Sequence, residues 1–130
     1  MASTDPDRSL GERVREARVA QGLTLRELAR RIKRAPSYVN DIEYNRRVPS
    51  EAVLREICDV LALDFDVMLS SAGRLGEEAE RYLKREPAAG VLFRRVYREG
   101  LSEAELKQLI AAADRLAKLR PPTPPEEETS

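Results

Sequence analysis

The chain has 130 residues, and 42% of them are apolar, which is enough to bury the core of one ordinary domain or of two small helical ones. It contains no histidine and a single cysteine, so an internal disulfide, the common zinc sites and histidine-based catalysis are excluded. The formal net charge is zero. We therefore expect a globular protein that is not an enzyme and that uses no cofactor and no metal.

The charge is unevenly distributed along the chain. Residues 8–50 hold eleven Lys or Arg against five Asp or Glu, a net charge of +6, whereas residues 51–130 carry a net charge of −4. A basic segment beside an acidic remainder is typical of a protein that contacts nucleic-acid phosphates through one region.

No apolar run approaches the roughly 20 residues that are needed to cross a bilayer. The N-terminal sequence MASTDPDRSL lacks the basic and apolar blocks of a signal peptide. We therefore expect a cytoplasmic protein with no membrane association.

Apolar residues recur at spacings of three and four along the chain, and alternating strand patterns are absent, so the predicted fold class is all-α. A first helix begins near Leu10 and stops near Gly22, a residue suited to the left-handed conformation that follows a helix end. Thr24 caps a second helix. Pro36 starts a third helix, at the position where its missing N–H is harmless, and Asn45 ends it.

Two further helices complete the predicted first domain. Ser50 caps the fourth and Asp64 caps the fifth, which Gly73 closes. Cys58 falls on the inner face of the fourth helix, where a cysteine is usually a small core residue. A redox sensor, the alternative, needs an exposed thiol of low pKa. We predict a five-helix domain over residues 8–73.

A second, smaller helical region is predicted over residues 77–119. It has helices at 77–86 and 88–99 and a last helix that starts with a capping box of Ser102 and Glu105. Residues 120–130 contain four prolines and three glutamates, a composition that predicts a disordered tail.

A helix ending at Ile32, a turn of about three residues and a short helix from Pro36 have the spacing of a helix-turn-helix, whose second helix lies in the DNA major groove. Residues 10–73 resemble the phage-repressor-like (Xre/Cro) family through LGERVREAR, GLTLRELARRI, PSYVNDIE, NRRVPS and LREICDVLALDFDVML. The resemblance implies a dimeric transcriptional repressor that binds an inverted repeat in double-stranded DNA through the helix at 36–45.

The resemblance also implies roles for individual residues. The base-reading positions are Pro36, Ser37, Asn40 and Asp41, whose side chains suit base edges. The positions that contact the DNA backbone are Thr24, Tyr38, Arg46 and Arg47. Arg18 and Glu43 match a buried ion pair that joins the first helix to the third. The sequence departs from the family pattern at Leu25, where a polar residue is usual, at Lys33 and Asn45, where glycine is usual, and at Ala35, where serine or threonine is usual.

The helices after residue 77 carry more apolar surface than two or three helices can cover alone. Pairing with a second subunit would bury it, and reading a palindrome requires a two-fold dimer. We assign homodimerisation to Leu92, Val96, Leu106, Leu109, Ile110 and Leu116. In the helix at 88–99 we expect Leu92, Phe93, Val96 and Tyr97 to face inward.

Other interpretations stay open. The layout also resembles repressors whose C-terminal region is cut by a partner metallopeptidase, which would split the apolar stripe between 106 and 119. The protein could instead be an antitoxin whose C-terminal region binds a toxin. In a third alternative, the helix-turn-helix serves only protein contacts.

Overall fold

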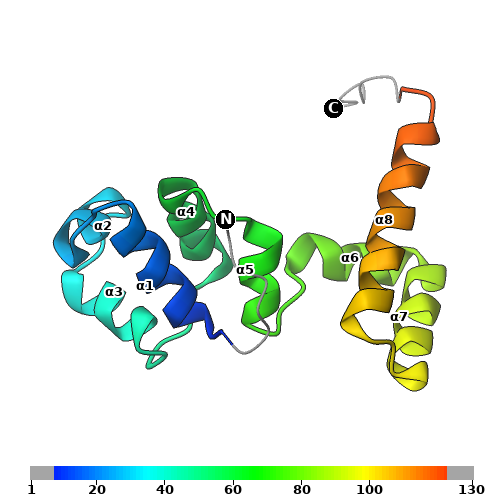
Figure 1. Ribbon diagram of the computed structural model, residues 1–130, viewed down its shortest axis with the longest axis horizontal. Helices are drawn as coiled ribbons and strands as arrows, with labels where there is room; N and C mark the ends of the chain where they lie inside the picture. The colour runs from blue at the N-terminus through cyan, green and yellow to red at the C-terminus, as the bar shows by residue number, and fades with distance from the viewer. Residues whose placement is uncertain (1–7, 123–130) are drawn as a thin grey trace. The chain divides into compact units, whose positions relative to one another are not determined.

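A computed structural model describes residues 8–122 of the chain. The predicted disordered tail at 120–130 lies largely outside these residues. Within them the chain forms eight helices and no strand, as the all-α prediction requires (Figure 1). The helices are α1 (Leu10–Ala20), α2 (Leu25–Arg31), α3 (Pro36–Glu43), α4 (Glu51–Leu61), α5 (Phe65–Ser71), α6 (Glu77–Arg85), α7 (Pro87–Glu99) and α8 (Glu103–Leu119).

The chain divides into two compact units, one through Tyr82 and one from Leu83. In the first unit α1 packs on α3 and α4, and α2 packs on α3 (Figure 1). Its core is a single cluster of apolar side chains contributed by α1–α5. The members with almost no exposed surface are Val14, Leu28, Val39, Ile42, Leu54, Ile57 and Met68.

The predicted helix starts are confirmed by their hydrogen bonds. The side chains of Thr24, Ser50, Asp64 and Ser102 each accept the backbone N–H three residues later, which satisfies a donor that the helix leaves unpaired. Both bonds of the predicted capping box are present. Helix α3 begins at Pro36, as predicted, but its cap residue Ala35 makes no side-chain bond.

The ends of α1, α2 and α3 share one geometry. In each, a residue of positive φ follows the helix, and the next residue donates its N–H to a carbonyl five positions back, as in a Schellman motif. The positive-φ residues are Gly22 (70°), Lys33 (57°) and Asn45 (60°). Lys33 therefore occupies the left-handed position where the family usually has glycine, which strains the helix-turn-helix.

The described part of the second unit, residues 83–122, has no buried residue in α7 or α8. The prediction that Leu92, Phe93 and Tyr97 face inward is wrong, because their side chains are 56%, 59% and 76% exposed. Helical periodicity identified an apolar face correctly, but the single chain supplies no surface that covers it.

The strain at Lys33 can be measured. Lys33→Gly removes a Cβ from a left-handed residue and should stabilise the protein by about 1 kcal/mol, a rise in Tm of about 4–8 °C for a domain of this size. Gly22→Ala adds a Cβ at the equivalent place after α1, where no atom lies within 4 Å, so it should lower Tm through backbone strain alone. Thermal unfolding followed by circular dichroism measures both. A Lys33→Gly protein with an unchanged or lower Tm would contradict the assignment.

Candidate nucleic-acid interface

One face of helix α3 is buried in the core, and the other face is accessible to solvent. Val39, Ile42 and Glu43 are buried, whereas the predicted base readers lie on the remaining surface: Pro36 and Ser37 are exposed, and Asn40 and Asp41 are half-buried. Positions 37, 40, 41 and 44 are spaced three and four apart, so they share one side of the helix. The structure thus brings the predicted polar side chains together on one accessible stripe.

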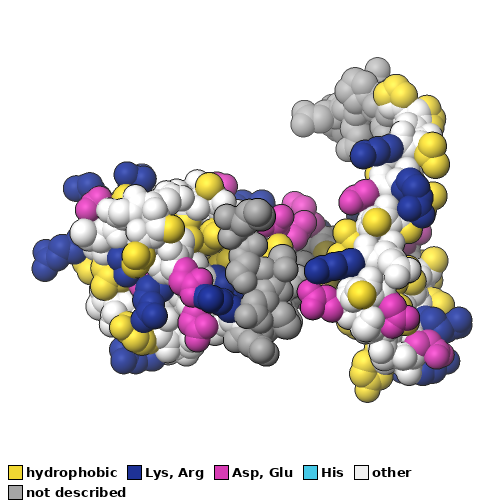
Figure 2. All heavy atoms as spheres, viewed as in Figure 1, with side chains coloured by type: hydrophobic (Ala, Val, Ile, Leu, Met, Phe, Trp, Pro, Cys, Tyr) yellow, Lys and Arg dark blue, Asp and Glu magenta, His cyan; other side chains and the backbone are white. Residues whose placement is uncertain are grey.

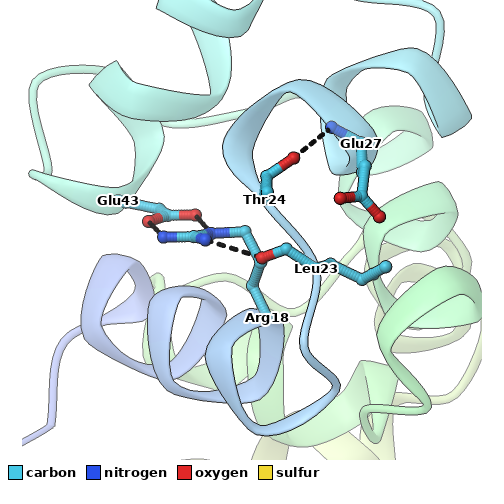
Figure 3. Close-up of polar contacts among 5 residues, drawn as sticks. All are labelled: Arg18, Leu23, Thr24, Glu27 and Glu43. Carbon is cyan, nitrogen blue, oxygen red and sulfur yellow. Dashed lines mark hydrogen bonds and ion pairs between the residues drawn. The ribbon is translucent and has the colours of Figure 1, made fainter.

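A buried ion pair holds α3 against α1 (Figure 3). The Arg18 guanidinium donates from Nε to Oε2 of Glu43 at 2.7 Å and from Nη2 to Oε1 at 3.0 Å, and its Nη1 donates to the Leu23 carbonyl at 2.8 Å. The Glu43 side chain has no exposed surface. The hydrogen bond to Glu43 raises the pKa of Arg18, so the guanidinium stays charged. One guanidinium therefore links the end of α3 to the loop before α2.

A second link between α1 and α3 was not predicted. Oδ1 of Asn45 accepts the Gly11 N–H at 3.0 Å, and Nδ2 of Asn45 donates to the Ser9 hydroxyl, also at 3.0 Å. A Cβ on Gly11 would lie 2.4 Å from the Glu43 carbonyl oxygen, so only glycine permits this approach. The sequence indicated that Asn45 tolerates positive φ, but no local pattern reveals which residue its amide binds.

The predicted backbone-contact residues lie within α3, in the loop after it and at the start of α2. Thr24 Oγ1 accepts the Glu27 N–H at 3.1 Å (Figure 3), which leaves its hydroxyl hydrogen free to be donated. The Tyr38 ring lies between two arginines, with the guanidinium carbons of Arg34 and Arg47 at 5.5 and 5.0 Å from its centroid. These are cation–π distances. The ring of Tyr38 therefore contacts two cationic side chains, Arg34 and Arg47.

Positive charge gathers on this part of the first unit. Figure 2 shows Lys and Arg side chains standing out from the region of α2 and α3. Arg46 makes an exposed ion pair with Asp41 at 3.6 Å, so one of the predicted backbone contacts lies beside one of the predicted base readers. An exposed pair of this kind contributes little to stability and can exchange for a phosphate.

Cys58 lies in the core and is not part of the basic surface. Burial raises the pKa of its thiol to about 11, and the nearby Asp59 and Asp64 act in the same direction. The thiol is therefore protonated at neutral pH, whereas a redox sensor needs an accessible thiolate. Over residues 8–122 no cluster of side chains could hold a metal ion, and no helix is long and apolar enough to span a bilayer.

The sequence is similar to known proteins. The helix-turn-helix domain family matches residues 9–70. The transcriptional regulator ClgR of Mycobacterium tuberculosis is 37% identical over 79 residues, which are 61% of this chain and 70% of that protein. The chain therefore belongs to the helix-turn-helix family of transcriptional regulators, a class of DNA-binding proteins.

Two solved structures are similar to part of the chain. The biofilm regulator SinR in complex with DNA is 33% identical and covers 46% of this chain and 97% of its own, with a TM-score of 0.44. The clp gene regulator ClgR of C. glutamicum is 35% identical and covers 49% of this chain and 84% of its own, with a TM-score of 0.43. The relative ClgR of Mycobacterium tuberculosis is a transcriptional regulator, so it lends no support to the antitoxin alternative.

The ion pair yields a stability prediction. Arg18→Met strands the Glu43 carboxylate in the core and should destabilise the protein by about 3 kcal/mol. Adding Glu43→Met removes the stranded charge and should recover most of that loss. Urea unfolding measures both, with Lys107→Met as the control, since Lys107 makes an exposed pair with Glu103 and its loss should change little. Equal losses in the single and double variants would contradict a buried-charge explanation.

Proposed function

We propose that the protein is a sequence-specific repressor that binds an inverted repeat as a homodimer, reads bases with α3 and has no catalytic role. The observation that carries the proposal is the accessible stripe of Ser37, Asn40 and Asp41 on a helix that Arg18 and Glu43 hold in place. Asn can bond adenine in bidentate fashion, Asp accepts from the cytosine amine, and a serine hydroxyl serves several bases.

Phosphate contacts would set the register of α3 on the duplex. Thr24 lies at the start of α2, and Arg46 and Arg47 lie in the loop after α3, so the predicted anchors come before and after the proposed reading helix along the chain. Arg34 joins them, because it shares the Tyr38 ring with Arg47. The net charge of +6 over residues 8–50 suits this role, since phosphate neutralisation supplies much of the affinity for DNA.

The second unit supports the dimer. Large apolar side chains of α7 and α8 are exposed, including Leu92 (56%), Ile110 (61%) and Leu116 (65%). Exposed patches of this kind mark interaction surfaces. A second copy is the occupant we propose, because two-fold symmetry would place two reading helices on the half-sites of a palindrome, one helical turn apart.

Selection of genomic fragments tests the reading helix. Purified protein at about 150 mM salt, which is close to physiological ionic strength, should enrich one inverted repeat. Changing Ser37, Asn40 and Asp41 to alanine together should relax the half-sites, because each good side-chain–base pair contributes about 1–3 kcal/mol of discrimination. The control replaces Asp59 and Asp66, two exposed acids on α4 and α5, and should keep the preference. A folded triple variant that enriches the same repeat equally well would contradict reading by α3.

Sedimentation velocity tests the dimer. Ile110→Glu places a charge in the proposed interface and should convert a dimer into a monomer. Ile110 is already 61% exposed in the single chain, so the change leaves the protein's own core intact. Gln108→Glu adds the same charge on the opposite side of α8 and should stay dimeric. Unmodified protein that sediments as a monomer at micromolar concentration would contradict the proposal.

A further inference from the structure

Two arginines from different elements lie close to the ring of Tyr44. The guanidinium carbons of Arg15 in α1 and of Arg46 in the loop after α3 lie 5.9 and 5.4 Å from the ring centroid. Tyr44 itself is 53% exposed. Two like charges therefore lie close to one exposed aromatic ring, and an anion bound by both would offset their mutual repulsion.

Arg15 has no carboxylate partner. Its neighbour Glu16 is engaged by Arg8, and among residues 8–122 no ion pair involves Arg15. Among residues 8–122, the one carboxylate that pairs with Arg46 is that of the half-buried Asp41, at 3.6 Å. Arg15 is thus a surface cation that is oriented by a ring and is not neutralised within the protein.

Backbone geometry fixes the position of the ring. Tyr44 is the residue that ends α3, and its N–H donates to the Asn40 carbonyl. The left-handed Asn45 that follows is bonded to Gly11 of α1. Tyr44 also lies three and four positions after Asp41 and Asn40, so it continues the stripe of proposed base readers. Arg15 and Arg46 therefore flank the C-terminal end of the reading face.

We propose that Arg15 and Arg46, stacked on Tyr44, form a clamp for a DNA phosphate beside the end of α3, with Arg15 as a phosphate ligand and Tyr44 as a positioning residue. The C-terminal end of a helix carries partial negative charge and by itself repels a phosphate, which is why two cations are needed at this place. The clamp extends the DNA contact surface to α1. The inference rests on the proposed DNA-binding function.

The salt dependence of binding distinguishes a phosphate ligand from a structural residue. The logarithm of the association constant falls with the logarithm of salt concentration, with a slope of about −0.9 for each phosphate neutralised. Arg15→Ala should make this slope shallower by about 0.9 per half-site. It should also weaken binding to an enriched fragment and binding to a scrambled duplex by the same factor, because a phosphate contact carries no sequence information. Tyr44→Leu should weaken binding, whereas Tyr44→Phe, which keeps the ring, should bind as the unmodified protein does.

Arg55 offers a matched control. It is an exposed arginine of the same unit that also stacks on a ring, 4.0 Å from the centroid of Phe65, but it lies on α4 beside Glu51, Asp64 and Glu78, which would repel a phosphate. Arg55→Ala should leave the slope unchanged. If Arg15→Ala gives the same slope as Arg55→Ala while the unmodified protein binds DNA, the clamp is refuted and the proposed function stands. If the unmodified protein binds no duplex, both proposals fail.

Discussion

The orientation of α3 depends on a carboxylate that has no exposed surface. Arg18 supplies two hydrogen bonds to the Glu43 carboxylate in the core, and a buried charge without a partner is strongly unfavourable. The pair gains little net stability over well-packed apolar residues. Its effect is directional, since the planar guanidinium accepts few arrangements of the carboxylate. α1 and α3 are therefore held in one mutual geometry, and the polar stripe of α3 with them.

Pre-organisation recurs at both ends of α3. Tyr38 and Tyr44 each have two arginines within cation–π distance of the ring, and a guanidinium that rests on a ring has lost rotamer freedom before any ligand arrives. Ordering a long side chain at an interface opposes binding by about 0.5–1.5 kcal/mol. Rings that carry out this ordering in the free protein lower the free-energy cost of contacting phosphate, without adding a single base contact.

The parts that the sequence predicted are those governed by local chemistry. Caps at Thr24, Ser50, Asp64 and Ser102 and the left-handed residues after helices follow from a few neighbouring residues, and the structure confirms them. The bond between Asn45 and Gly11 spans 34 positions, so no local pattern could reveal it. The inward placement of Leu92, Phe93 and Tyr97 failed for a related reason, because periodicity identifies an apolar face but not what covers it.

The two units of the chain differ in how their apolar residues are buried. The first buries a core of its own and carries the basic charge. The second buries no residue of α7 or α8, so in the proposed dimer its packing comes from association. In the proposed dimer, the second unit becomes ordered when two subunits pair, and pairing allows both half-sites to be occupied. These steps are therefore coupled, and all of them depend on protein concentration. Any event that opens the pair then weakens DNA binding through lost avidity, with α3 itself unchanged.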